Sequence, residues 1–101
     1  MTRPAFDAAN YETPELAELN RPLHSLGWDM IEAERALTAL TASRAPKAEW
    51  DAQFAVVAAA RSAHATALDA YDVLVAAYCE RAEAAEAAAV EAVEAHPAFA
   101  F

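Results

Sequence analysis

PKAEWDAQFAVVAAARSAHATALDAYDVLVAAYCERAEAAEAAAVEAVEA, from Pro46 to Ala95, is the stretch that decides the fold. After Pro46 it contains no further proline and no glycine, and alanine, glutamate and leucine favour helix. Fifty helical residues would extend over about 75 Å, far longer than an average helix. We therefore predict one long helix over Pro46–Ala95, with a break near Arg61–His64 as the open alternative.

The composition of the whole chain points the same way. Among 101 residues there are 31 alanines and one glycine, Gly27, while β-branched residues are scattered. Sheets need turn glycines and runs of Val, Ile or Thr, so this composition favours an all-α fold. Only 27 residues carry larger apolar side chains, which predicts a thin hydrophobic core.

Two earlier helices are expected to precede the long one. Thr13-Pro14-Glu15 combines a capping residue, proline at the first helical position and an acidic first turn, which predicts a short helix over Thr13–Asn20. Pro22 then interrupts it and opens a second helix, Pro22–Arg44, before the turn at Ala45-Pro46. The expected organisation is an N-terminal arm at 1–12, which is docked or disordered, a helical domain at 13–96 and an apolar tail at 97–101.

Apolar residues recur at alternating steps of three and four in both longer helices, as in a coiled-coil seam. This spacing predicts an antiparallel helical hairpin, bundle-like or coiled-coil-like, with a long acidic second helix. The expected core is Leu23, Leu26, Met30, Leu37, Leu40, Trp50, Phe54, Val57, Leu68, Tyr71, Val75 and Tyr78. Arg61 and His64 form a polar layer on the seam.

The register of the hairpin predicts which residues lie opposite Arg61 and His64. If the chain turns at Pro46, residue numbers that face each other sum to about 91. Arg61 then lies near Met30, within reach of Glu34, and His64 faces Gly27. The polar layer is either satisfied inside the hairpin or sets the register of an oligomer.

Beyond about Glu80 the long helix has no facing helix to cover it. The seam there continues as Ala82, Ala85 and Ala89, which would let another helix approach closely. Glu80, Glu83, Glu91 and Glu94 fall within an arc of about 80° at 100° per residue. Phe99 and Phe101 follow Pro97 in the tail. We expect these residues to bind a partner, although a solvated acidic face and a frayed tail are the alternatives.

Several classes of function are disfavoured. The net charge of −9 argues against direct binding to nucleic acid or to an anionic membrane. Histidines lie far apart, Cys79 is the single cysteine, and no phosphate-binding glycine loop is present. We expect no catalytic residues, no metal site and no cofactor, and a cytoplasmic location.

Three functional hypotheses follow from these features. The first is a non-enzymatic protein-interaction module that binds itself or another protein. The second is an acidic, nucleic-acid-mimicking inhibitor of the small phage type, suggested by the charge and the row of glutamates. The third, a virion or other assembly component, depends only on the long helix.

Overall fold

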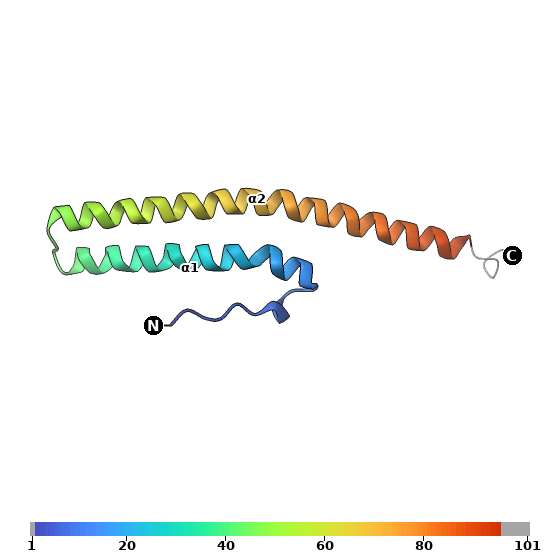
Figure 1. Ribbon diagram of the computed structural model, residues 1–101, viewed down its shortest axis with the longest axis horizontal. Helices are drawn as coiled ribbons and strands as arrows, with labels where there is room; N and C mark the ends of the chain where they lie inside the picture. Colours follow the sequence, from blue (N-terminus) through green and yellow to red (C-terminus); the bar gives the residue numbers. More distant parts are fainter. Residues whose placement is uncertain (1, 96–101) are drawn as a thin grey trace. The chain divides into compact units, whose positions relative to one another are not determined.

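A computed structural model describes residues 2–95 of the chain, and these residues form two long helices and one short one. The 3-10 helix η1 covers Ala8–Asn10, helix α1 covers Pro14–Ala42, and helix α2 covers Lys47–Glu94 (Figure 1). The chain divides after Tyr71 into two compact units, which are described separately. In the first unit α1 runs antiparallel to the first half of α2, which confirms the predicted helical hairpin.

Helix α1 begins where the sequence predicts. The hydroxyl of Thr13 accepts a hydrogen bond from the amide of Leu16 at 3.2 Å, and Pro14 occupies the first helical position. The helix ends at Ala42, because Arg44 adopts a left-handed backbone conformation with φ 55°. The amide of Ala45 then donates to the Leu40 carbonyl at 3.0 Å, which satisfies one of the last carbonyls of the helix.

The predicted break at Pro22 is wrong, since α1 continues through it as one helix. Proline removes one backbone donor and normally kinks or ends a helix, at a cost of about 3 kcal/mol. Packing before the proline offsets this cost: Ala17 is buried, and the Asn20 amide donates to the Tyr71 hydroxyl at 3.2 Å. The same Asn20 amide also donates to the Leu16 carbonyl at 2.9 Å.

The two helices of the first unit meet in layers that repeat every seven residues. Asn20 bonds to Tyr71, Gly27 lies against the His64 ring, and Thr41 accepts a 2.9 Å hydrogen bond from the Trp50 indole. In each of these three pairs the residue numbers sum to 91, the register expected from the sequence. Seven residues are two helical turns, so the layers follow the geometry of an antiparallel coiled coil.

The buried core of the first unit is small. Among residues 2–95 only Ala17, Ala33 and Val57 are buried, and Val57 is the largest side chain that is fully enclosed. The face of α2 toward α1 consists of residues that are buried or half-buried: Trp50, Gln53, Val57, Ala60, His64, Ala67 and Tyr71. All five residues expected in the core on α1 are half-buried: Leu23, Leu26, Met30, Leu37 and Leu40.

Two residues expected in the core are exposed instead. Phe54 and Leu68 are 49% and 41% exposed, and Arg61 lies between them in the same row of α2, seven residues from each. Burying this row would have placed the Arg61 guanidinium in the apolar contact, which is unfavourable for a charged group. The small side chains Ala60 and Ala67 face α1 instead, and Phe54 stacks on Trp50 with 5.3 Å between ring centroids.

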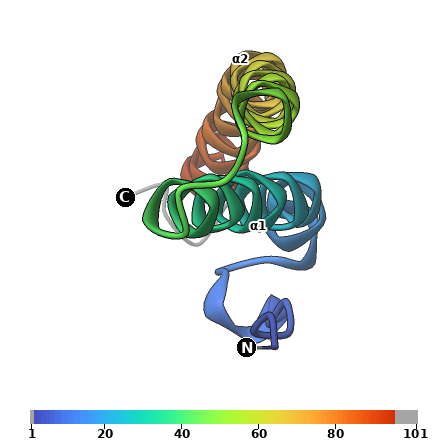
Figure 2. The same ribbon diagram turned by 90° about the vertical axis from the view of Figure 1, so that its left-hand side faces the viewer.

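The N-terminal arm, residues 2–12, is docked in the first unit. Figure 2 shows it on one side of α1 while α2 lies on the opposite side, so α1 forms the middle layer. Asp7 caps η1 by accepting a hydrogen bond from the amide of Ala9 at 2.9 Å. The alternative of a docked arm, left open by the sequence, is therefore the one observed.

The second unit contains the distal part of α2, from Asp72 to Glu94. Helix α2 runs without interruption through Arg61–His64, so the alternative of a break there is not observed. Every residue from Cys79 to Ala95 is exposed. Within residues 2–95, no helix is both long enough and apolar enough to cross a membrane.

Candidate functional site

Both residues of the polar layer, Arg61 and His64, lie against the facing helix α1. The Arg61 side chain donates from Nε to a Glu34 carboxylate oxygen at 2.8 Å, and both side chains remain open to solvent. The His64 ring is half-buried against Gly27. A Cβ added to Gly27 would lie 3.9 Å from Nε2 of His64, an ordinary van der Waals distance. Arg61 therefore has an ionic partner within the hairpin, and His64 lies against Gly27 of the facing helix.

The alanine stripe, defined as Ala82, Ala85 and Ala89, lies exposed on the distal part of α2. These residues continue the seven-residue repeat of half-buried Val75 and Tyr78. Alanine side chains present little apolar area, but they allow two helix backbones to approach closely. The stripe is suited to contact with another helix along its length.

The glutamate ridge, defined as Glu80, Glu83, Glu91 and Glu94, is also exposed on this part of α2. At 100° per residue its centre lies about 170° around the helix from the centre of the alanine stripe. One partner helix cannot contact both surfaces at once. The two surfaces that the sequence analysis grouped together are therefore separate candidate sites on opposite faces.

Two further residues, Val90 and Val93, were not assigned to a site from the sequence. Both are about half exposed, and Val93 borders the alanine stripe. Two open hollows on this part of α2 share Glu86, Val90 and Glu94 as lining residues. The sequence did contain a pattern that indicates them, because these valines are the only large apolar side chains between Tyr78 and His96.

Within residues 2–95, no three histidine, cysteine, aspartate or glutamate side chains gather closely enough to hold a metal ion. Cys79 carries a free thiol on the exposed surface of α2. Phe99 and Phe101, which were expected to bind a partner, lie outside the described residues.

Charged contacts elsewhere in the first unit are surface ion pairs. Arg21 pairs with Glu18 one turn earlier at 2.8 Å, and Lys47 pairs with Asp51 at 2.8 Å. Hydrogen bonding from Arg21 lowers the pKa of the Glu18 carboxyl, and the same bond raises the pKa of Arg21. Exposed pairs of this kind stabilise a helix weakly.

Comparison of the chain with protein-family models, with curated proteins and with solved structures finds no match.

Proposed function

We propose that the protein is a non-enzymatic helical interaction module that associates with a second copy of itself through the alanine stripe of α2. The observation that supports this most directly is that every residue of α2 from Cys79 to Glu94 is exposed, including the apolar side chains of Val90 and Val93. In proteins most helical stability comes from tertiary contacts on one face of the helix rather than from intrinsic propensity. A second helix on the stripe would supply those contacts.

The spacing of the stripe fits a helical partner. Val75, Tyr78, Ala82, Ala85 and Ala89 follow steps of three and four, the pattern of a left-handed coiled-coil seam. Pairing along this seam leaves the glutamate ridge on the far side, in solvent. A symmetric dimer is the simplest closed assembly that such a self-complementary surface can form.

Charge supplies a signature for self-association. Each copy carries a net charge of −9, so two copies repel one another at long range. Salt screens this repulsion, and we therefore expect the dimer to become more stable as ionic strength rises from 0.05 to about 0.5 M.

The test compares two substitutions in the stripe with one on the opposite face. Ala82→Asp and Ala89→Asp place a charge in the seam, whereas Ala87→Asp makes the same change at the centre of the glutamate ridge. We expect light scattering behind a sizing column to give a dimer for the wild type and for Ala87→Asp. The two stripe variants should give 10.8 kDa monomers.

A wild-type chain that stays at 10.8 kDa at millimolar concentration would refute self-association. Equal masses for all three variants would show that the stripe is not the contact.

The glutamate ridge supports a second candidate function, an acidic inhibitor that occupies the nucleic-acid site of a basic protein. Its four carboxylates span about 21 Å along one exposed face at 1.5 Å per residue, comparable to a row of phosphates. The probe is a sequence-independent DNA-binding protein bound to a fluorescent DNA duplex. Displacement of the duplex should weaken as salt rises, opposite in sign to the dimer.

The control for this function replaces all four ridge glutamates with glutamine, which keeps their size and removes their charge. Displacement that is unchanged by this replacement would reject the ridge as a nucleic-acid mimic.

A further inference from the structure

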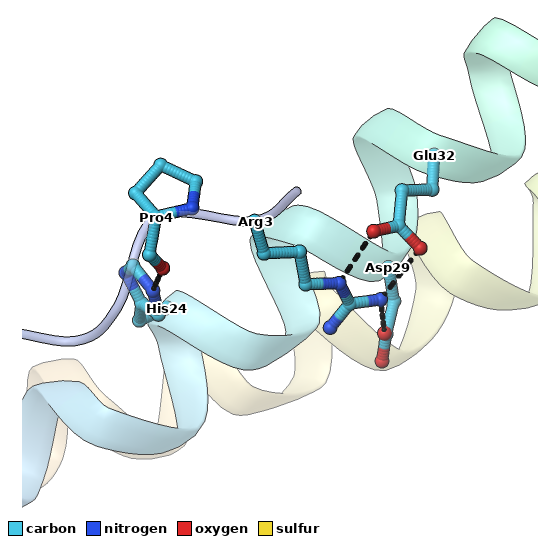
Figure 3. Close-up of polar contacts among 5 residues, drawn as sticks. All are labelled: Arg3, Pro4, His24, Asp29 and Glu32. Atoms are coloured by element: carbon cyan, nitrogen blue, oxygen red, sulfur yellow. Dashed lines mark hydrogen bonds and ion pairs between the residues drawn. The ribbon is translucent and has the colours of Figure 1, made fainter. Parts of the chain in front are cut away.

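The outer face of α1 holds residues 3–6 of the N-terminal arm through three different contacts. The first is an ion pair between the Arg3 guanidinium and the carboxylates of Asp29 and Glu32 (Figure 3). Arg3 donates to Asp29 at 2.5 Å and to the two oxygens of Glu32 at 2.5 and 2.8 Å. These hydrogen bonds, that to Glu32 first, raise the pKa of Arg3, and the bond from Arg3 lowers the pKa of Glu32.

The second contact is a backbone hydrogen bond. The Pro4 carbonyl lies 3.0 Å from Nε2 of His24, and Figure 3 shows the imidazole aimed at this oxygen. A carbonyl oxygen can only accept, so Nε2 of His24 carries the hydrogen. The imidazole therefore fixes the direction of the arm along α1.

The third contact is a slot for an aromatic ring. Phe6 meets the His24 ring edge-on at 5.5 Å, and the Arg21 guanidinium lies 4.6 Å from the centre of the Phe6 ring. Tyr11 also stacks on Phe6, with 5.7 Å between ring centroids, and the Phe6 side chain is half-buried. Edge contacts and cation–π contacts of this kind favour a phenyl ring over an aliphatic side chain.

These contacts fit a short segment that offers a side-chain nitrogen donor, then the backbone carbonyl of the next residue, then a phenylalanine two residues after that. The arm supplies Arg3-Pro4-Ala5-Phe6. The same tripeptide, Pro-Ala-Phe, recurs once more in the chain, as Pro97-Ala98-Phe99, and it again follows a residue with a nitrogen donor, His96. The two ends of the chain thus carry RPAF and HPAF.

We propose that the arm site, defined as Arg21, His24, Asp29 and Glu32 on α1, also binds residues 96–99 of a second copy of the chain. The His96 ring takes the place of the Arg3 guanidinium at the two carboxylates. The Pro97 carbonyl accepts the hydrogen bond from His24, and Phe99 enters the ring slot. This surface is separate from the alanine stripe, so the proposal does not depend on the function proposed above.

The length of the chain favours a second copy as the source of the tail. The helical residues from Asp72 to Glu94 rise about 33 Å, whereas the five residues from Ala95 to Phe99 reach at most about 18 Å. The tail is therefore too short to return along its own helix to Tyr71. A tail from another molecule has no such limit.

Competition sets when the tail binds. The arm belongs to the same chain as its site, so its effective concentration is on the order of millimolar. Arg3 also makes a forked contact to Glu32, whereas a histidine ring offers one hydrogen-bonding edge to a carboxylate. The arm is thus the preferred occupant, and the tail of a second copy enters when the arm is displaced.

The test uses a peptide with the sequence of residues 96–101 and a full-length receptor whose own two segments are disabled. The receptor carries Arg3→Ala and Phe6→Ala to release the arm, and Phe99→Ala to silence its own tail. Amide chemical shifts are followed by NMR as peptide is added to several millimolar. The Arg3→Ala single variant is a second receptor, in which the peptide must displace a weakened arm.

We expect shifts at His24, Asp29 and Glu32, and competition from a peptide of residues 2–7. Phe99→Ala in the peptide should weaken binding about tenfold or more, since it removes a buried ring. The matched control is Phe101→Ala, which makes the same change outside the repeated sequence and should alter binding less than about twofold. An added Ala82→Asp substitution in the receptor should have no effect, which separates this site from the alanine stripe.

Absence of shifts in the arm site at several millimolar peptide would overturn the proposal. So would shifts confined to α2, or equal losses from Phe99→Ala and Phe101→Ala.

Discussion

Val57→Ala is the substitution that tests the core most directly, because Val57 is 1% exposed and is the largest fully enclosed side chain among the described residues. The change removes two carbon atoms from a packed site, worth about 1.5 kcal/mol in transfer free energy and more if a cavity remains. Alanine has the higher helix propensity, which returns about 0.5 kcal/mol. We expect a net loss of about 1–2.5 kcal/mol in the free energy of unfolding.

Val56→Ala is a matched control, since Val56 is the adjacent residue in the same helix and is 51% exposed. The propensity gain is the same but little packing is lost, so this variant should be neutral or slightly stabilised. Urea unfolding is followed by tryptophan fluorescence, because Trp28 and Trp50 both lie in the first unit. If the two variants differ by less than about 0.5 kcal/mol, Val57 is not the centre of the core and the described packing is wrong.

Three further predictions concern α1 and the arm. Gly27→Ala should stabilise the hairpin by about 0.5–1 kcal/mol in thermal unfolding, because the added Cβ would lie 3.9 Å from His64, an ordinary contact distance. A loss of stability in this variant would show that the helices are closer together than described. Because Arg3 lowers the pKa of Glu32, the contribution of this ion pair to arm docking is complete above the ordinary glutamate pKa and is lost as pH falls through the lowered one. A carboxyl-carbon NMR titration should show the Glu32 pKa rising toward its ordinary value in Arg3→Gln, and an identical titration in both chains would contradict the ion pair. Thr13→Ala removes the N-cap and should cost about 0.5–2 kcal/mol, while the isosteric Thr13→Val, which also lacks the acceptor, should cost a similar amount in the same unfolding assay.

The long helix α2 and the register of the hairpin were predictable from the sequence for simple physical reasons. A single turn at Pro46 fixes which residues of two antiparallel helices face each other, and Gly27 accordingly lies against His64. The ion pair between Arg61 and Glu34 follows from the same register. Helix type and alignment depend on spacing along the chain, which the sequence contains in full.

The side of α2 that faces α1 was harder to predict. Apolar spacing favoured the row with Phe54 and Leu68, whereas the structure turns Ala60 and Ala67 toward α1. In an alanine-rich helix, a small rotation exchanges one adequate contact face for another at little cost in buried area. The position of one charged residue, Arg61, then decides which face of α2 turns toward α1. The spacing of apolar residues alone does not include the cost of burying that charge.

Two other features depended on contacts between distant parts of the sequence. Continuation of α1 through Pro22 relies on the burial of Ala17 and on the hydrogen bond from Asn20 to Tyr71, which no local rule includes. The docked arm relies on Arg3 finding two carboxylates about 26 and 29 residues further along the chain. The division between the alanine stripe and the glutamate ridge, by contrast, follows from helical geometry and could have been drawn earlier.

The seven-residue layers of the hairpin make its length adjustable in fixed increments. The pairs at Asn20 and Tyr71, Gly27 and His64, and Thr41 and Trp50 are related by whole heptads on both helices. Excising or duplicating seven residues in α1 together with the seven that face them in α2 would change the hairpin by about 10.5 Å and leave every other layer aligned. A deletion in one helix alone would shift all layers beyond it. Heptads can thus be added or removed only in facing pairs, one in each helix. Such changes would alter the distance along α2 between the turn and an interaction surface without any change to the turn itself.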